Sequence, residues 1–150
     1  TAFGNRALES TFFIPLQFNT AFGYKTLLNN TTGTFNTAIG GNSLRLNKTG
    51  FSNVAVGYSS LFSNTTGAGN TANGYQALYY NTTGDINTAN GYQALQLNVS
   101  GEFNAASGYQ ALQSNTTGGN NTASGYQSLW SIQVETIILP MAIRNFIQTQ

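Results

Sequence analysis

One spacing of 17 residues governs most of this 150-residue chain. The motif N-T-A-x-G-Y returns at that period, and its glycine falls at Gly23, Gly40, Gly57, Gly74, Gly91, Gly108 and Gly125. The consensus unit reads N-T-A-x-G-Y-x-A-L-x-x-N-x-T-G-x-x, and a first, partial unit begins at Thr1. An unbroken period of this kind indicates an array of identical structural units that stack on one another.

The length and content of the unit favour strands over helices. A pair of helices needs a repeat of roughly 34–45 residues, and the two glycines and the many Asn and Thr residues of each unit oppose helix. Two short strands and two turns fit the unit. We therefore predict an all-β fold, a parallel β-solenoid or β-roll with two strands per coil and coils ~4.8 Å apart.

Stacking also explains the composition. Each residue would lie above its counterpart 17 positions away, so a charged consensus position would line up like charges, and only 6% of the residues are charged. An invariant leucine column and an invariant alanine column predict a thin apolar core. These columns are Leu27, Leu44, Leu61, Leu78, Leu95, Leu112 and Leu129, and Ala21, Ala38, Ala55, Ala72, Ala89, Ala106 and Ala123.

The composition argues against several functional classes. The net charge of +1 gives no electrostatic case for nucleic acid or for an anionic membrane. The chain has no Cys and no His, so it lacks the usual nucleophiles, bases and soft metal ligands. Its acids are Glu9, Asp85, Glu102 and Glu135. Asp85 and Glu102 share a column, but no ligand cluster supports a calcium or catalytic pair there, so we expect no enzyme activity, cofactor or metal.

Two polar columns are candidate functional features. The sequence Asn-x-Thr/Ser-Gly is formally a glycan acceptor, and it is equally a turn in which Asn bonds the backbone and Gly supplies a positive φ. We favour a turn ladder over glycans at Asn30, Asn47, Asn64, Asn81, Asn98 and Asn115. The aromatic column could bind carbohydrate, but we favour a stacked ladder, buried or between chains, at Tyr24, Tyr58, Tyr75, Tyr92, Tyr109 and Tyr126.

The residue before the consensus glycine changes character along the chain. It is apolar at Phe3, Phe22, Ile39 and Val56, and polar at Asn73, Asn90, Ser107 and Ser124. Either the apolar half belongs to a thicker N-terminal core, or it is exposed and covered by another chain.

Two segments depart from the repeat that spans residues 1–131. Between Gly4 and Gly23 the step is 19 residues, which places an irregular, apolar insertion at 11–18. Residues 132–150 match no unit, but synonymous codons for this tail, read in a shifted frame, encode N-T-A-N-G-Y-Q with its glycine 17 positions after Gly125. We therefore interpret the tail as a frame-shifted repeat, with a genuine C-terminal cap as the competing reading.

The segment "NTAIGGNSL" resembles the S-x-A-x-G motif in the heads of trimeric autotransporter adhesins, with Asn36, Ala38 and Gly40 at the matching positions. The repeat also resembles those of tail-fibre-like proteins. The familiar head repeat is shorter than the 17 residues found here. The resemblance implies a left-handed β-roll and a homotrimer that packs around one axis.

From this resemblance we expect a non-enzymatic structural or adhesive segment of an extracellular, cell-surface or virion fibre. Its partners would be further copies of the chain and a host surface or glycan, with no membrane insertion within the segment. The alternative is a monomeric β-solenoid that binds carbohydrate or ice, although no T-x-T strand motif recurs.

Overall fold

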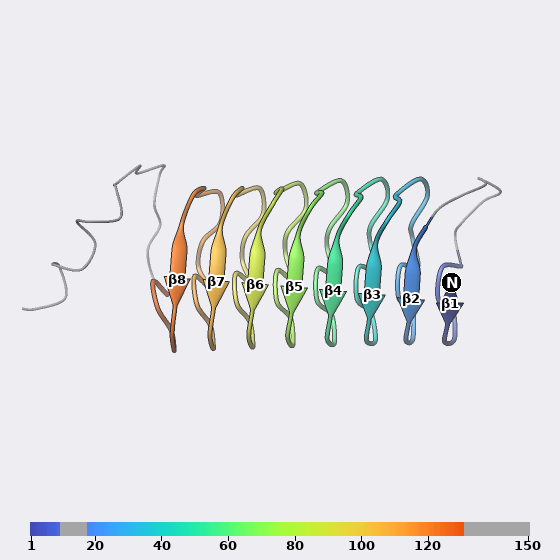
Figure 1. The fold of residues 1–150 in the computed structure, drawn as a ribbon, viewed down its shortest axis with the longest axis horizontal. Helices are drawn as coiled ribbons and strands as arrows, with labels where there is room; N and C mark the ends of the chain where they lie inside the picture. The colour runs from blue at the N-terminus through green and yellow to red at the C-terminus, as the bar shows by residue number, and fades with distance from the viewer. Residues whose placement is uncertain (10–17, 131–150) are drawn as a thin grey trace, which may run out of the picture.

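A computed structural model describes residues 1–9 and 18–130 of the chain. Each coil contributes one short strand to a single parallel sheet, and the strands follow one another in chain order (Figure 1). The strands are β1 (Ala2–Phe3), β2 (Thr20–Phe22), β3 (Thr37–Ile39), β4 (Val54–Val56), β5 (Thr71–Asn73), β6 (Thr88–Asn90), β7 (Ala105–Ser107) and β8 (Thr122–Ser124). The predicted all-β parallel solenoid is confirmed.

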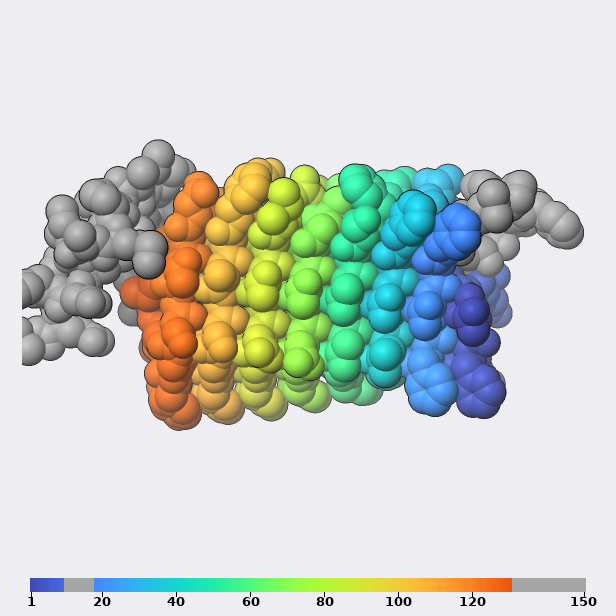
Figure 2. All heavy atoms as spheres, viewed as in Figure 1, coloured from blue at the N-terminus to red at the C-terminus, as the bar shows by residue number. Residues whose placement is uncertain are grey.

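The register of the sheet follows the repeat. Ala38 pairs with Ala55 and Ala72 with Ala89, so each residue lies above its counterpart in the next coil. The space-filling view accordingly shows the coils as parallel bands that follow one another along the long axis (Figure 2). Ala2 pairs with Ala21 in spite of the longer first step, so the extra residues leave the sheet register intact.

The prediction of two strands per coil is wrong, because the described coils have only one. In the segment that follows each strand and its glycine, two residues have left-handed backbone angles, for example Gln76 with φ 54° and Leu78 with φ 51°. Left-handed residues break the extended geometry of a strand. Neighbouring coils are still joined there, since the amide of Leu78 donates to the carbonyl of Ala94 at 3.0 Å and the amide of Tyr80 donates to that of Gln96 at 3.0 Å.

One side of the interior is apolar. The leucines from Leu27 to Leu112 are almost fully buried, and they pack in one cluster with the alanines from Ala21 to Ala123. Leu129, in the last described coil, is partly buried. Leucine and alanine columns therefore form the thin core that the invariant positions predicted.

The other side of the interior is built from amides. Two asparagine columns are buried in the described coils, one before each strand and one in the Asn-x-Thr/Ser-Gly turn. We call them the strand asparagines (Asn19, Asn36, Asn53, Asn70, Asn87, Asn104 and Asn121) and the turn asparagines (Asn30, Asn47, Asn64, Asn81, Asn98 and Asn115). Buried amides need partners, and each column finds them in the coil above or below.

The turn glycine links the two amide columns. The carbonyl of Gly67 accepts a hydrogen bond from Asn53 at 2.8 Å and another from Asn64 at 2.9 Å. A Cβ on Gly67 would lie 2.5 Å from the Asn64 side-chain oxygen, and the φ of this glycine is not in the left-handed region. The expectation that the turn glycine supplies a positive φ is therefore wrong; the position requires glycine because the amides leave no space for a side chain.

The two irregular segments fall largely outside the described residues. Residues 10–17 and the interpretation of 132–150 as a shifted repeat or a cap are not covered by the structure. Phe18, the last residue of the predicted insertion, follows the repeat, because its ring stacks on that of Phe35, 17 residues later, with centroids 5.4 Å apart. In the described part of the chain, no helix has the length and apolar character that a membrane span requires.

Candidate binding surface

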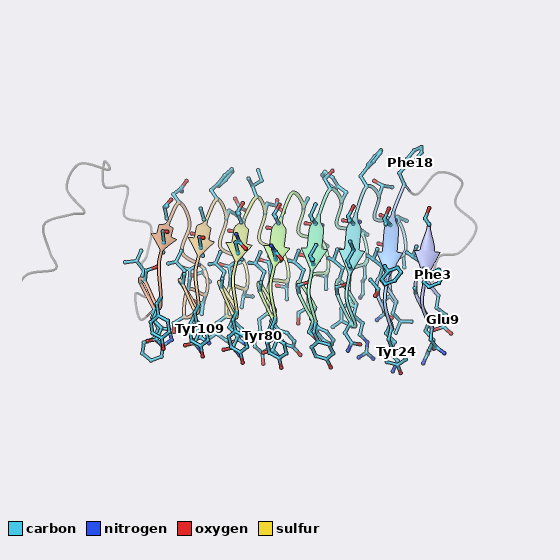
Figure 3. All side chains as sticks on the ribbon, turned by 60° about the horizontal axis from the view of Figure 1, so that its bottom comes forward. Phe3, Glu9, Phe18, Tyr24, Tyr80 and Tyr109 are labelled. Carbon is cyan, nitrogen blue, oxygen red and sulfur yellow. The ribbon has the colours of Figure 1, made fainter. Side chains whose placement is uncertain are left out.

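The tyrosine column forms an exposed ladder along one edge of the solenoid. Tyr24 and Tyr109 lie on this edge, and Phe18 lies on the opposite one (Figure 3). From Tyr58 to Tyr126 the successive rings are nearly parallel, with centroids 5.0–5.8 Å apart, and we call these five residues the tyrosine ladder. The predicted stacking is present, but the rings are 41–73% exposed rather than buried within the chain.

Stacking decides what the tyrosine ladder can offer to a ligand. Tyr75, Tyr92 and Tyr109 have a ring neighbour on both faces, so only their edges and hydroxyls face outward. Sugar recognition by aromatic residues uses the ring face, which these rings do not present. This geometry disfavours the carbohydrate-binding strip along the regular part of the ladder.

A ladder of glutamines runs beside the tyrosines. Gln93 donates to Gln76 at 3.1 Å, Gln110 to Gln93 at 2.9 Å and Gln127 to Gln110 at 2.9 Å. Cross-links join this column to a second amide column, with Gln96 donating to Gln76 at 2.9 Å. These glutamines are not among the predicted functional residues, although their invariance over the last four units is a usable sequence signal.

The outer face of the sheet carries the column that changes from apolar to polar. Phe3, Phe22 and Ile39 are 70%, 54% and 40% exposed, and the two phenylalanine rings stack at 5.3 Å. Asn73 and Asn90 follow on the same face, where they are joined by a hydrogen bond of 3.3 Å. The reading in which this apolar half belongs to a thicker core is therefore wrong; it is an exposed apolar stripe on the single chain.

The turn asparagines are not accessible for glycosylation in this fold. Each is almost fully buried. In Asn64 the side-chain nitrogen, which a glycan would modify, donates to the Asn47 side-chain oxygen at 2.8 Å and to the Gly67 carbonyl at 2.9 Å. The structure thus places all six residues in an internal ladder.

The acids do not gather into a metal-binding cluster in the described residues. Within 1–9 and 18–130, no three or more Asp, Glu, His or Cys side chains gather closely enough to hold a metal ion. Asp85 accepts a hydrogen bond from the backbone of Ala68 at 2.7 Å, so its carboxylate joins its own coil to the preceding one. Glu9 pairs with Arg6 at 2.5 Å.

The first coils differ from the rest in charge. The ammonium of Lys25 lies 4.8 Å from the centroid of the Tyr24 ring. A hydrogen bond from Lys25 lowers the pKa of the Tyr24 phenol below its ordinary value, and the charges of Lys25, Arg6 and Arg45 act in the same direction. Three cations therefore lie around one tyrosine at the N-terminal end of the edge.

Tyr79 shows the opposite behaviour on the same side of the molecule. Its ring stacks on that of Phe62 with centroids 5.0 Å apart and meets Tyr80 edge-on at 4.7 Å. Desolvation in this cluster raises the pKa of the Tyr79 phenol above its ordinary value.

Comparison of the chain with protein-family models, with curated proteins and with solved structures found no match.

Proposed function

We propose that this chain is a non-enzymatic structural segment of an extracellular or virion surface fibre, in which copies of the chain associate through the outer face of the sheet. The observation that carries the proposal is the apolar stripe formed by Phe3, Phe22, Ile39 and Val56. The rigid stack of coils would act as a spacer and would display the tyrosine edge to solvent or to a host surface.

Exposure of the stripe supports association. Two stacked phenylalanine rings and an isoleucine lie in one line on the flat face of the sheet. Contiguous exposed apolar area of this kind marks protein interaction sites, and a straight, regular stripe on one chain is complementary to the same stripe on a parallel copy. The left-handed winding and the threefold assembly come from the resemblance to adhesin heads alone and stay predictions.

The change to Asn and Ser in later coils suggests the matched variants for a test. Sedimentation velocity on the full chain should give the mass of a trimer. Phe22→Asn with Ile39→Asn places in the stripe the residue found at Asn73 and Asn90, and it should yield a folded monomer. Phe103→Asn, on a different exposed column, should leave the oligomer intact.

Two results would contradict this assignment. A native chain that sediments as a stable monomer would remove the fibre hypothesis. An oligomer that survives the double substitution but dissociates with Phe103→Asn would move the interface away from the sheet.

A second candidate function is favoured by the threonines of the sheet. Thr71, Thr88 and Thr122 are exposed on the same face as Asn73 and Asn90, in rungs of one regular sheet. A flat array of hydroxyl and amide groups is the kind of surface that a monomeric ice-binding solenoid would use. Thermal hysteresis that is lost in Thr88→Lys would support this candidate, and its absence in the native chain would remove it.

A further inference from the structure

The tyrosine column has one gap, at Gly41. The consensus places tyrosine at this position, and Gly41 stands between Tyr24 and Tyr58. Two rungs separate those rings, which corresponds to roughly 10 Å at the usual strand spacing. None of the described ring contacts joins Tyr24 to Tyr58, whereas Tyr58 stacks on Tyr75 at 5.8 Å.

The fold does not require glycine at this position. A Cβ built on Gly41 would meet the Tyr58 ring at 3.4 Å and 3.5 Å, which is ordinary contact, and the φ of Gly41 is not in the left-handed region. In contrast, Gly40 has φ +119° and its Cβ would lie 2.6 Å from the Gly57 carbonyl oxygen. Folding therefore explains Gly40 and leaves Gly41 without a structural reason.

Cations replace glutamines beside the gap. In the later coils, residues 20 positions apart are neighbours, since Gln96 donates to Gln76 at 2.9 Å and Gln113 donates to Gln93 at 3.3 Å. Lys25 and Arg45 have the same separation. Two positive charges thus occupy columns in which amides elsewhere hydrogen-bond, and neighbouring like charges favour the binding of an anion.

The same coil holds the unsatisfied polar atoms of the described chain. Within residues 1–9 and 18–130, the only buried side-chain atoms without a hydrogen-bond partner are Asn42 Oδ1 and Arg45 Nε. Asn42 follows Gly41 directly, and the Arg45 guanidinium is held against the Phe62 ring at 5.6 Å. Unsatisfied buried groups are rare, and each calls for an explanation, such as a functional role or a bound ion.

From these observations we propose that the gap at Gly41, bounded by Tyr24, Tyr58, Lys25 and Arg45, binds a planar aromatic ring that carries an anionic group. The ring takes the place of the missing tyrosine, because two rungs span about twice the spacing of the stacked rings elsewhere in the ladder, which leaves room for one further ring. The anionic group lies toward Lys25 and Arg45, which have no carboxylate partner among the described ion pairs. The proposal does not depend on the fibre function.

The test uses naphthalene-2-sulfonate as the probe, with calorimetry on the full chain and NMR of the tyrosine rings. We expect saturable binding that shifts the ring signals of Tyr24 and Tyr58 and leaves those of Tyr109 unchanged. 2-Methylnaphthalene, which has the ring but no charge, should bind much more weakly. Methanesulfonate, which has the charge but no ring, should also bind much more weakly.

One variant fills the gap and another removes the charges beside it, and both use residues that the repeat has at the same positions in other coils. Gly41→Tyr completes the column and should abolish probe binding, while Gly41→Ala, whose Cβ fits, should keep it. Lys25→Gln with Arg45→Gln restores the amide pair of the later coils and should weaken binding about tenfold, as expected for two exposed charge pairs. Lys48→Gln is the matched control and should change nothing.

Circular dichroism checks that each variant keeps the fold of the native chain. Binding that persists in folded Gly41→Tyr would overturn the proposal. Equal affinity for 2-methylnaphthalene, or binding that leaves the Tyr24 and Tyr58 signals unchanged, would do the same.

Discussion

A single turn asparagine connects three coils. The side chain of Asn64 donates to Asn47 at 2.8 Å and to Gly67 at 2.9 Å, and it accepts from Asn81 at 2.9 Å. Asn64→Ala should lower the free energy of unfolding by about 1–3 kcal/mol, because it leaves a buried acceptor on Asn47 without a donor. Urea unfolding measures this. The exposed Asn73→Ala should cost less than about 0.5 kcal/mol, and equal losses for the two variants would show that the ladder does not stabilise the fold.

The column that contains Ile86 carries backbone strain. Ile86 has φ 54°, and the same column holds Gly69 with φ 66° and Asn120 with φ 60°. A β-branched residue is disfavoured in this region, whereas Asn is tolerated. Since Ile86 is 55% exposed, little core packing is lost on replacement.

Ile86→Asn should therefore stabilise the chain by about 1 kcal/mol, measured by urea unfolding. Ile86→Val keeps the branch at Cβ and should give no gain. A loss of stability in Ile86→Asn would mean that contacts of the Ile86 side chain outweigh the strain.

At the residue scale, the sequence predicts a position correctly where its residue type has only one structural explanation. Leu61 and Ala55 are invariant and apolar in their columns, and both are fully buried. Asn64 had two readings from sequence, a glycan acceptor and a turn, because Asn-Thr-Thr satisfies both patterns. The contact that distinguishes a turn from a glycan acceptor comes from the preceding coil, where the Asn47 side chain accepts a hydrogen bond from Asn64.

At the level of a coil, the tyrosines are expected to ionise in an order set by their neighbours. The pKa of Tyr24 is lowered by its hydrogen bond from Lys25, and the pKa of Tyr79 is raised by desolvation. Titration of the phenolate absorbance should show Tyr24 ionising early and Tyr79 late. Lys25→Gln should raise the first of these pKa values, and Tyr79→Phe should remove the last ionisation. An unchanged early ionisation in Lys25→Gln would contradict the assignment.

The raised pKa of Tyr79 also makes stability depend on pH. Because the unfolded phenol keeps the ordinary value of 10.0, the unfolded state loses its proton first as the pH rises. The contribution of Tyr79 to stability is therefore complete below pH 10.0 and is lost as the pH rises through the folded pKa. Urea unfolding above this pH should show a smaller decline in Tyr79→Phe than in the native chain, and Tyr24, with its lowered pKa, acts in the opposite direction.

The number of strands in a coil was not predictable from the repeat. A 17-residue unit has room for two short strands and two turns, which is why the repeat predicts two strands per coil. The backbone instead alternates into left-handed angles at Gln93 and Leu95, with φ of 53° and 50°. Leu and Gln give no local signal for such angles, so the contacts between coils must impose them.

For the whole molecule, the repeat register matters more than the number of coils. Residues 70–78 and 87–95 have the same sequence, and the strands within them pair residue by residue in the register of the repeat. Removal of residues 70–86 therefore joins coils whose Asn, Ala, Tyr and Leu columns still match. In a solenoid, stability is approximately a sum of contributions from single repeats and from nearest-neighbour contacts.

The chain that lacks residues 70–86 should fold with the same circular dichroism spectrum and unfold cooperatively. Its free energy of unfolding should fall by the contribution of one coil. The slope of this free energy against urea concentration should fall in the same way, because the slope follows the surface that unfolding exposes. Removal of only residues 70–78 deletes fewer residues but places apolar columns above polar ones, so it should destabilise the chain far more. If the two deletions lower stability in proportion to their lengths, the matched columns do not hold the coils together, and the ladders of Asn, Tyr and Gln are a consequence of the fold rather than its cause.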